Sequence, residues 1–269
     1  MFLRKAAAFI KKEFLIKVSY RFAFLLQIFS IVSRLLIFYF IDRLFGSNIV
    51  SQLKPYGVNY FPYVFLGLAF FTYVGTGLGS FANRIRNEQL MGTLEALLAT
   101  PTKISTMVIS IGLWSFIWAS ISVLVYLICG AFLFGVDLTR TNLLSALVIL
   151  LLTITSFSGL GLSAASFIMI LKRGEPFTWL VNTLFGLFGG VYFPISILPG
   201  WIRIISYLLP VTYAVKTMQL AVYRGYPLSA LTGEITALLI FSAISLPSGL
   251  LLFKGAVKWA KRAGNLAHY

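Results

Sequence analysis

Long apolar runs, separated by short polar segments, dominate the chain. Six of these runs reach the length of about 20 apolar residues that a helix needs to cross a bilayer. They are residues 22–41, 60–82, 104–136, 141–171, most of 176–202, and 235–253. Because backbone groups in lipid have to be paired within the chain, each run predicts a helix. The pattern therefore predicts an all-α polytopic membrane protein with six transmembrane helices.

A short amphipathic segment at residues 88–98, EQLMGTLEALL, separates the second and third runs. Its apolar residues recur at the spacing of one helix face. They are Leu90, Met91, Leu94, Leu97 and Leu98, and Glu88 and Glu95 lie on the other side. A helix of this length measures roughly 16 Å, too short to cross a bilayer. We expect a short helix that docks on another surface; a solvated helix without a partner is the alternative.

The N-terminal residues 1–21 are a second segment that is not predicted to cross the membrane. Basic pairs at Arg4/Lys5 and Lys11/Lys12 lie seven positions apart and share a helix face, with apolar residues largely elsewhere. This arrangement predicts an interfacial helix in the headgroup layer. A basic flank that only orients the first span is a compatible alternative.

Prolines divide the apolar stretch between the fifth and sixth runs. Pro194, Pro199 and Pro210 leave the pieces 201–209 and 211–223, each too short to cross. We expect a re-entrant pair of helices that dips into the outer leaflet. An amphipathic surface loop is the alternative interpretation.

The composition excludes a soluble protein. Hydrophobic residues make up 59% of the chain and charged residues only 11%, where soluble domains carry about 25% charged residues. The net charge of +15 raises the question of nucleic-acid binding. We reject that interpretation, because the basic residues flank the apolar runs, as membrane topology requires, and form no separate patch.

The basic residues also predict the orientation. Fifteen of the 22 lysines and arginines fall on the side of the two termini, six on the opposite side, and Arg34 lies within the first span. The positive-inside rule then places both termini and the 88–98 segment in the cytoplasm. We expect a multi-pass protein of the cell membrane (inner or plasma membrane). Its single domain, 1–269, divides into the interfacial helix, a bundle over 22–256 and a cytoplasmic tail over 257–269.

Two stretches together resemble a known family. The segment MGTLEALLATP, from Met91, and the segment YFPISILPGWIRIISYLLPVTYAV, from Tyr192, are similar to type-2 ATP-binding-cassette (ABC) export permeases. The resemblance implies that the 88–98 helix is a coupling helix, which contacts a separate ABC ATPase subunit. It also implies that two copies, either identical chains or close paralogues, form the pathway among the membrane lipids. ATP and Mg would then bind at the partner ATPase and not at this chain.

Several residues are candidates for a substrate pathway. Arg34 lies near the middle of the first span, where a charge is costly and usually faces a cavity or a partner; snorkelling to the membrane surface is the alternative. Aromatic residues near the predicted outer ends are the other candidates, with an interfacial aromatic belt as their alternative role. They are Tyr60, Tyr192, Phe193 and Tyr213. Gly75 and Gly79 form a GxxxG pair, for which helix packing and a flexible gate both stay open.

The sequence carries no motif for chemistry of its own. It has no GxxxxGK[ST] phosphate loop and no HExxH motif, and its single histidine, His268, lies outside every span. We therefore predict no catalytic residue and no metal site. An ATP-independent carrier or channel, and a scaffold that does not transport, remain the alternatives. The sequence does not distinguish drug, lipid and glycan substrates.

Overall fold

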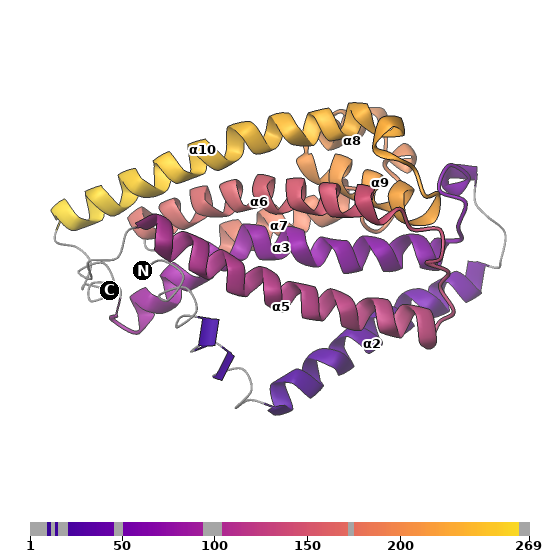
Figure 1. Cartoon of the computed structure of the whole chain (residues 1–269), viewed down its shortest axis with the longest axis horizontal. Helices are drawn as coiled ribbons and strands as arrows, with labels where there is room; N and C mark the ends of the chain where they lie inside the picture. The colour runs from indigo at the N-terminus through magenta and orange to yellow at the C-terminus, as the bar shows by residue number, and fades with distance from the viewer. Residues whose placement is uncertain are drawn as a thin grey trace.

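The computed structural model describes six stretches of the chain. They are 10–11, 14–15, 21–45, 51–93, 104–171 and 175–263. All regular structure among them is helical (Figure 1). The α-helices are α2 (Arg21–Phe45), α3 (Tyr60–Leu90), α5 (Ile104–Phe132), α6 (Leu143–Leu171), α7 (Glu175–Phe188), α8 (Gly200–Leu208), α9 (Pro210–Tyr223) and α10 (Thr232–Ala263). Short 3-10 turns lie at Ser51–Leu53, Ile195–Ile197 and Leu228–Ala230.

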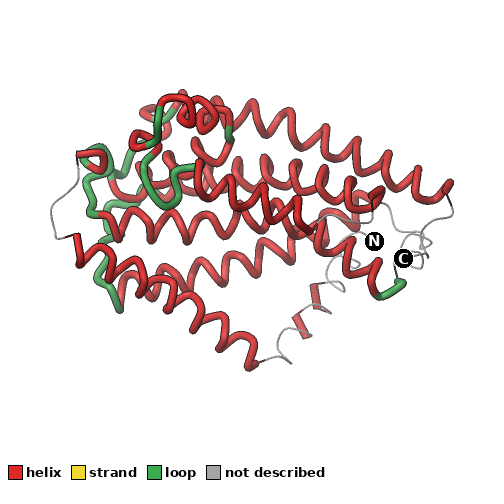
Figure 2. The backbone as a smooth tube through the Cα atoms, turned by 180° about the vertical axis from the view of Figure 1, so that it is seen from behind, coloured by secondary structure: helices red, strands yellow, loops and turns green. Residues whose placement is uncertain are grey.

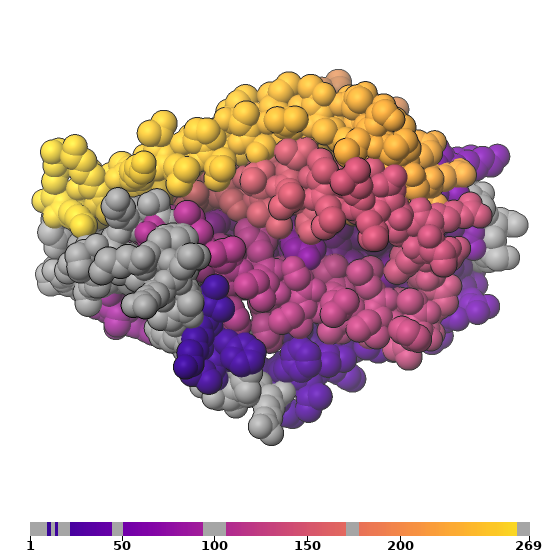
Figure 3. Space-filling model, in the orientation of Figure 1, coloured from indigo at the N-terminus to yellow at the C-terminus, as the bar shows by residue number. Residues whose placement is uncertain are grey.

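Helix α3 lies at the centre of the bundle. It packs against α5 and α6 and also contacts α2, α7 and α9. Helix α6 lies between α3 and α10, and in the space-filling view α10, α6 and α5 form three adjacent bands (Figure 3). Near its start α2 diverges from α5, and the long side chain of Gln27 bridges the two helices, with Nε2 donating to Ser122 Oγ at 2.6 Å. Its last turns meet α3, where the backbone N–H of Phe61 donates to Asp42 at 3.2 Å.

Five of the described helices are long and apolar enough to cross a membrane. They are the segments Phe22–Leu44, Tyr60–Leu90, Thr106–Phe132, Leu143–Ile170 and Thr232–Arg262. The predicted fifth span, over most of 176–202, was too long. Helix α7 has 14 residues, about 21 Å of helix, and ends at Phe188. Gly190, with φ at +78°, turns the chain there into a conformation that L residues rarely adopt.

The other predicted spans are present, with shifted ends. Helix α3 continues past the predicted limit at 82 to Leu90, and α10 continues past 253 to Ala263. Residues 257–263, assigned to a cytoplasmic tail, are therefore helical. Of the predicted N-terminal interfacial helix, residues 10–11 and 14–15 are described and helical, and Arg21 is the first residue of α2. The rest of that prediction lies outside the described residues.

Close backbone approaches hold α3, α6 and α10 together. A Cβ at Gly161 of α6 would lie 2.0 Å from the carbonyl oxygen of Gly77 in α3. On the other side of α6, a Cβ at Gly159 would lie 2.2 Å from the backbone of Ser245 in α10. Neither site tolerates a side chain, since real Cβ atoms do not approach so closely. Small residues therefore set the helix spacing, as they do in other membrane bundles.

The described loops gather at one end of the bundle, apart from the turn after α3 (Figure 2). Helices α8 and α9 lie at that end, and they match the predicted pieces on either side of Pro210, which occupies the first turn of α9. Helix α9 is buried along nearly its whole length, whereas α8 exposes most of its residues. Burial raises the pKa of Tyr56, in the loop before α3, above its ordinary value.

Side-chain hydrogen bonds fix α9 to α3 at this end. Gln219 Nε2 donates to the carbonyl of Tyr63 at 3.2 Å, and the Tyr223 hydroxyl donates to the carbonyl of Pro62. The Tyr63 hydroxyl donates to the carbonyl of Gly190 at 2.7 Å, which ties the end of α7 to α3. The loop end of the bundle is therefore rigidly cross-connected.

Candidate functional site

A polar groove of about 530 Å³ lies between α3 and α5. Its volume falls in the range of roughly 300–1,000 Å³ that is usual for ligand sites. Helix α3 contributes Thr72, Gly75, Thr76, Gly79, Ser80, Asn83, Arg84 and Asn87, and α5 contributes Ile111, Trp114, Ser115 and Trp118. The groove covers the half of α3 that leads to the turn after Leu90.

The spacing of polar residues along α3 creates the groove. Thr72, Thr76, Ser80, Asn83 and Asn87 follow one another at intervals of three or four positions, which places them on one helix face. The opposite face is apolar and buried in the core, for example at Val74 and Phe81. Gly75 and Gly79 lie in the polar face and line the groove. The close contact with α6 is made by Gly77, which lies between them.

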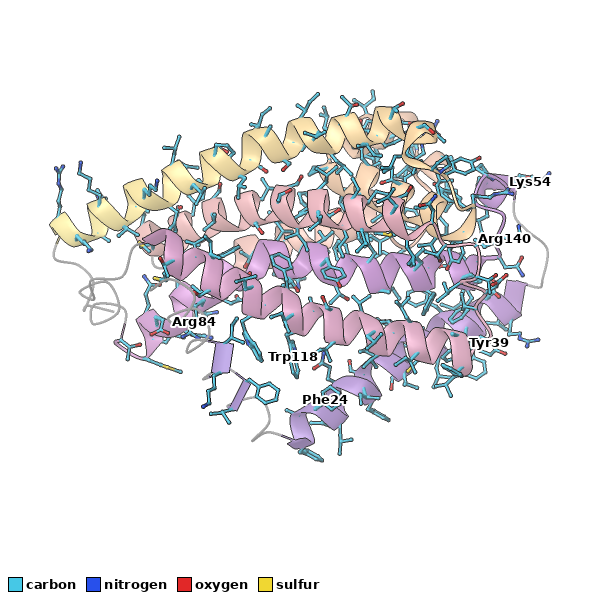
Figure 4. All side chains as sticks on the ribbon, in the orientation of Figure 1. Phe24, Tyr39, Lys54, Arg84, Trp118 and Arg140 are labelled. Carbon is cyan, nitrogen blue, oxygen red and sulfur yellow. The ribbon has the colours of Figure 1, made fainter. Side chains whose placement is uncertain are left out.

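Aromatic rings form the wall of the groove on the α5 side. Trp114 and Trp118 stack with ring centroids 6.3 Å apart and planes at 29°. Phe24 of α2 meets Trp118 edge-on at 6.1 Å, and Phe14 meets Trp114 edge-on at 6.5 Å. Figure 4 shows Trp118 and Phe24 on the side of the bundle where α2 diverges from α5. Rings in such edge and offset arrangements attract one another beyond simple burial.

An ion pair marks the end of the groove where α3 ends. Arg84 Nη2 lies 2.8 Å from Glu88 Oε1, and the Thr93 hydroxyl donates to Glu88 as well. Figure 4 shows Arg84 at the opposite end of the bundle from Lys54 and Arg140. Among the described residues that line the groove, Arg84 carries the only charge, and Glu88 offsets that charge.

The end of α3 corrects the predicted coupling helix. Residues 88–98 do not form one helix, because α3 continues through Glu88 to Leu90 and then stops. Gly92 has φ at +65°, its N–H donates to Gln89, and the N–H of Thr93 donates to Glu88 at 2.9 Å. These two bonds define a Schellman motif, in which a glycine in the left-handed conformation ends a helix. The amphipathic spacing favoured a continuous helix, but Gly92 is a stop signal.

The structure places three of the predicted coupling residues. Leu90 and Met91 are 61% and 74% exposed at the end of α3, as a docking surface requires. Glu88 instead pairs with Arg84 within its own helix. The remaining coupling residues, Leu94, Glu95, Leu97 and Leu98, lie outside the described residues.

The candidate pathway residues do not form one site. Arg34 and Tyr192 both interact electrostatically with the Tyr126 hydroxyl of α5. Tyr192 also stacks on Phe38 of α2, with centroids 6.0 Å apart. The structure thus brings Arg34 and Tyr192 to one region.

The other pathway candidates lie elsewhere. Tyr60 begins α3 and interacts electrostatically with Asp42, and half-buried Phe193 lies in the turn after α7. Tyr213 donates to the carbonyl of Tyr207 at 2.8 Å and packs against Phe241 of α10. Apart from Gly75 and Gly79, sequence reasoning missed the groove residues. Their signal was present in the three- and four-residue spacing of Thr, Ser and Asn within the second span.

The comparison with known proteins identifies the family. The family model for the ABC-2 type transporter matches residues 5–223, most of the chain. No curated protein matches the chain. Helix α10 follows the matched segment but packs along α6, so it belongs to the same bundle. Members of this family are membrane subunits without an ATPase site of their own, and they associate with an ABC ATPase subunit. The chain therefore belongs to the ABC-2 type transporter family and is a multi-pass permease component of an ABC transporter.

Proposed function

We propose that the chain is the permease subunit of an ABC exporter, works as a dimer, and is driven by separate ATPase subunits that hold ATP and Mg. The observation that carries the proposal is that one helix, α3, bears the polar groove and ends in the exposed residues Leu90 and Met91. A displacement of that end by an ATPase subunit would act directly on the wall of the groove. The residues Leu94, Glu95, Leu97 and Leu98 extend the proposed docking surface.

The proposed orientation puts the Arg84 end of α3 in the cytoplasm. The basic residues Lys254, Lys258, Lys261 and Arg262 lie in the last turns of α10. Figure 1 shows α3 and α10 ending on the same side of the bundle, away from the clustered loops. The positive-inside rule then favours a cytoplasmic location for this side and for both termini.

The proposal also includes six crossings and a re-entrant pair. Helix α7 would be a shorter sixth crossing that reaches the clustered loops, and α8 and α9 would enter the outer leaflet from that side. The burial of α9 against α3, α6 and α10 supports its placement within the bundle. Irregular backbone is tolerated at such depth when protein surrounds it.

A second copy of the chain, or a close paralogue, would cover the exposed side of α2. Large apolar side chains lie exposed along this helix, among them Phe22, Phe29 and Phe40. Most of its surface makes few contacts within the chain. Contiguous exposed apolar surface is expected in a membrane protein that faces lipid or another subunit, so a dimer across α2 is consistent with it.

Co-purification tests the ATPase partnership. The double variant Leu90→Asp with Met91→Asp is expected to lose the ATPase subunit, because two charges replace the apolar docking surface. Leu133→Asp is the matched control, since Leu133 is 65% exposed at the other end of α5. Equal recovery of the ATPase with both variants would contradict the proposal. Transport by the permease alone under an ion gradient would favour an ATP-independent carrier.

A further inference from the structure

The groove between α3 and α5 is lined mainly by uncharged polar side chains. Six of its side chains are uncharged hydrogen-bonding groups, and no carboxylate belongs to the described lining. They are Thr72, Thr76, Ser80, Asn83, Asn87 and Ser115. Hydroxyl and amide groups both donate and accept hydrogen bonds. A partner that offers several donors and acceptors at close spacing therefore fits this surface.

One buried oxygen atom of the groove wall, Ser80 Oγ, has no hydrogen-bond partner in the described structure. A buried polar atom without a partner destabilises the protein. A ligand that reaches Ser80 and forms a hydrogen bond with its hydroxyl would remove that penalty. The unpaired hydroxyl is thus an observation, independent of the groove's shape, that points to a polar ligand.

The charges around the groove disfavour a cationic ligand. Arg84 is the charged residue in the described lining, and a second positive charge beside it would be repelled. An anionic ligand gains little in return, because Glu88 already lies 2.8 Å from the Arg84 guanidinium. Displacing that carboxylate would leave it uncompensated in a half-buried position. The electrostatics therefore select an uncharged head group.

The tryptophan pair adds a flat surface with a polar edge. Trp114 and Trp118 stack along the groove wall at 6.3 Å, and both line the cavity. An aromatic face packs against C–H groups, while the indole N–H is a hydrogen-bond donor. A saturated ring with C–H faces and hydroxyl groups at its edge matches both features.

We propose that this groove binds the uncharged, hydroxyl-rich head group of an amphiphilic substrate, chemically a sugar or polyol. The apolar tail would remain in lipid on the side where α2 diverges from α5. Binding of the head group follows from the lining alone; its role as transport cargo rests on the function proposed above.

Tryptophan fluorescence tests the proposal directly. The chain has five tryptophans, and Trp179, Trp201 and Trp259 lie outside the groove. A variant with these three replaced by Phe, in lipid nanodiscs, reports on Trp114 and Trp118. The probes are decyl glucoside, decyl trimethylammonium and decyl phosphate, each below its micelle concentration. We expect a saturable change with the glucoside, and binding of the cation at least about tenfold weaker, or 1.4 kcal/mol.

Groove variants separate specific binding from partition into lipid. Thr76→Val with Asn83→Leu should weaken glucoside binding about tenfold or more, since it removes two hydrogen-bonding groups. Thr236→Val is the control, because Thr236 is exposed on α10 and donates only to its own helix. Thermal unfolding monitored on the same samples shows whether the groove variant keeps its fold. If it does not, Ser115→Ala on the opposite wall is the replacement.

Three results would overturn the inference: equal or tighter binding of the cation, equal or tighter binding of the phosphate, and no saturable binding of the glucoside. These results are independent of the ATPase subunit, which the nanodiscs do not contain. Glucoside binding without any effect on ATP hydrolysis in the full complex would contradict the proposed transport role and leave the binding site intact. Coupling to the ATPase without glucoside binding would contradict the proposed binding site and leave the proposed permease function intact.

Discussion

Arg84 and Glu88 form an ion pair of 2.8 Å one turn before α3 ends, so the charge at the mouth of the polar groove is balanced within the same helix. The two residues lie four positions apart, with Glu88 also accepting from Thr93 in the turn that follows. The pair therefore links the groove to the turn that begins the proposed docking segment.

A double-mutant cycle on Arg84→Gln and Glu88→Gln measures this pair. The expected coupling energy is about 0.5–1 kcal/mol, because solvent screens an ion pair that is partly exposed. Thermal unfolding of the four proteins gives the value. Additive effects of the two substitutions would show that the pair contributes nothing to stability.

Gly92→Ala is expected to destabilise the turn by about 1 kcal/mol, because an L side chain is strained in the left-handed conformation. No atom lies within 4 Å of the position a Cβ would take, so the cost is conformational and not steric. Gly92→Asn should cost less, since asparagine tolerates this conformation better. Equal stability of the glycine and alanine proteins, measured by chemical or thermal unfolding, would argue against the Schellman motif.

The helix ends at Gly92 and Gly190 show which features the sequence predicts well and which it does not. Apolar runs located the five long apolar helices, and Pro210 correctly separated α8 from α9. At residues 88–98 the amphipathic spacing wrongly predicted one continuous helix. Such spacing indicates which face of a helix each residue would occupy, but it does not indicate that the helix ends at Gly92. Likewise, the charge-free run after 176 concealed the end of α7, which depends on the backbone conformation at Gly190.

The groove could not be predicted from the sequence, for a different reason. Its polar stripe on α3 is visible as spacing, but its wall comes from Trp114 and Trp118 of α5. Which face of α3 meets α5, and which meets α6 through Gly77, depends on packing between segments far apart in the chain. Such packing is visible only in the tertiary structure.

Gly161→Ala tests the close contact between α3 and α6. A Cβ there would lie 2.0 Å from the carbonyl oxygen of Gly77, so the helices would have to separate. Overpacking of this kind costs about 1–3 kcal/mol. Gly255→Ala in α10 is the matched control, with nothing within 4 Å of its Cβ position. It should be neutral or stabilise the helix by about 0.5–1 kcal/mol. Similar unfolding temperatures for the two variants would contradict the packing.

Cysteine cross-linking tests the contact between α2 and α5. In a Cys129→Ser background, Gln27→Cys with Ser122→Cys should be joined by a short bifunctional thiol cross-linker, because the Gln27 amide of α2 lies 2.6 Å from the Ser122 hydroxyl of α5. A cross-linker is used because cysteine is shorter than glutamine and a direct disulfide requires a closer approach. Leu25→Cys with Ser122→Cys is the control, since Leu25 is an exposed residue of α2. Equal cross-linking of both pairs would show that α2 does not hold this orientation. Gel mobility after proteolysis between the helices provides the measurement.

The central claim is that an ATPase subunit acts through the end of α3 on the polar groove, and labelling of the groove tests it most directly. A Thr76→Cys variant in the Cys129→Ser background, assembled with its ATPase, is reacted with a membrane-impermeant maleimide with and without trapped ATP. Thr236→Cys on α10 controls for general exposure. The account predicts that trapped ATP changes the labelling rate at position 76 several-fold, that position 236 does not respond, and that the response disappears with Leu90→Asp and Met91→Asp. An identical labelling rate at position 76 in the two nucleotide states would contradict the account.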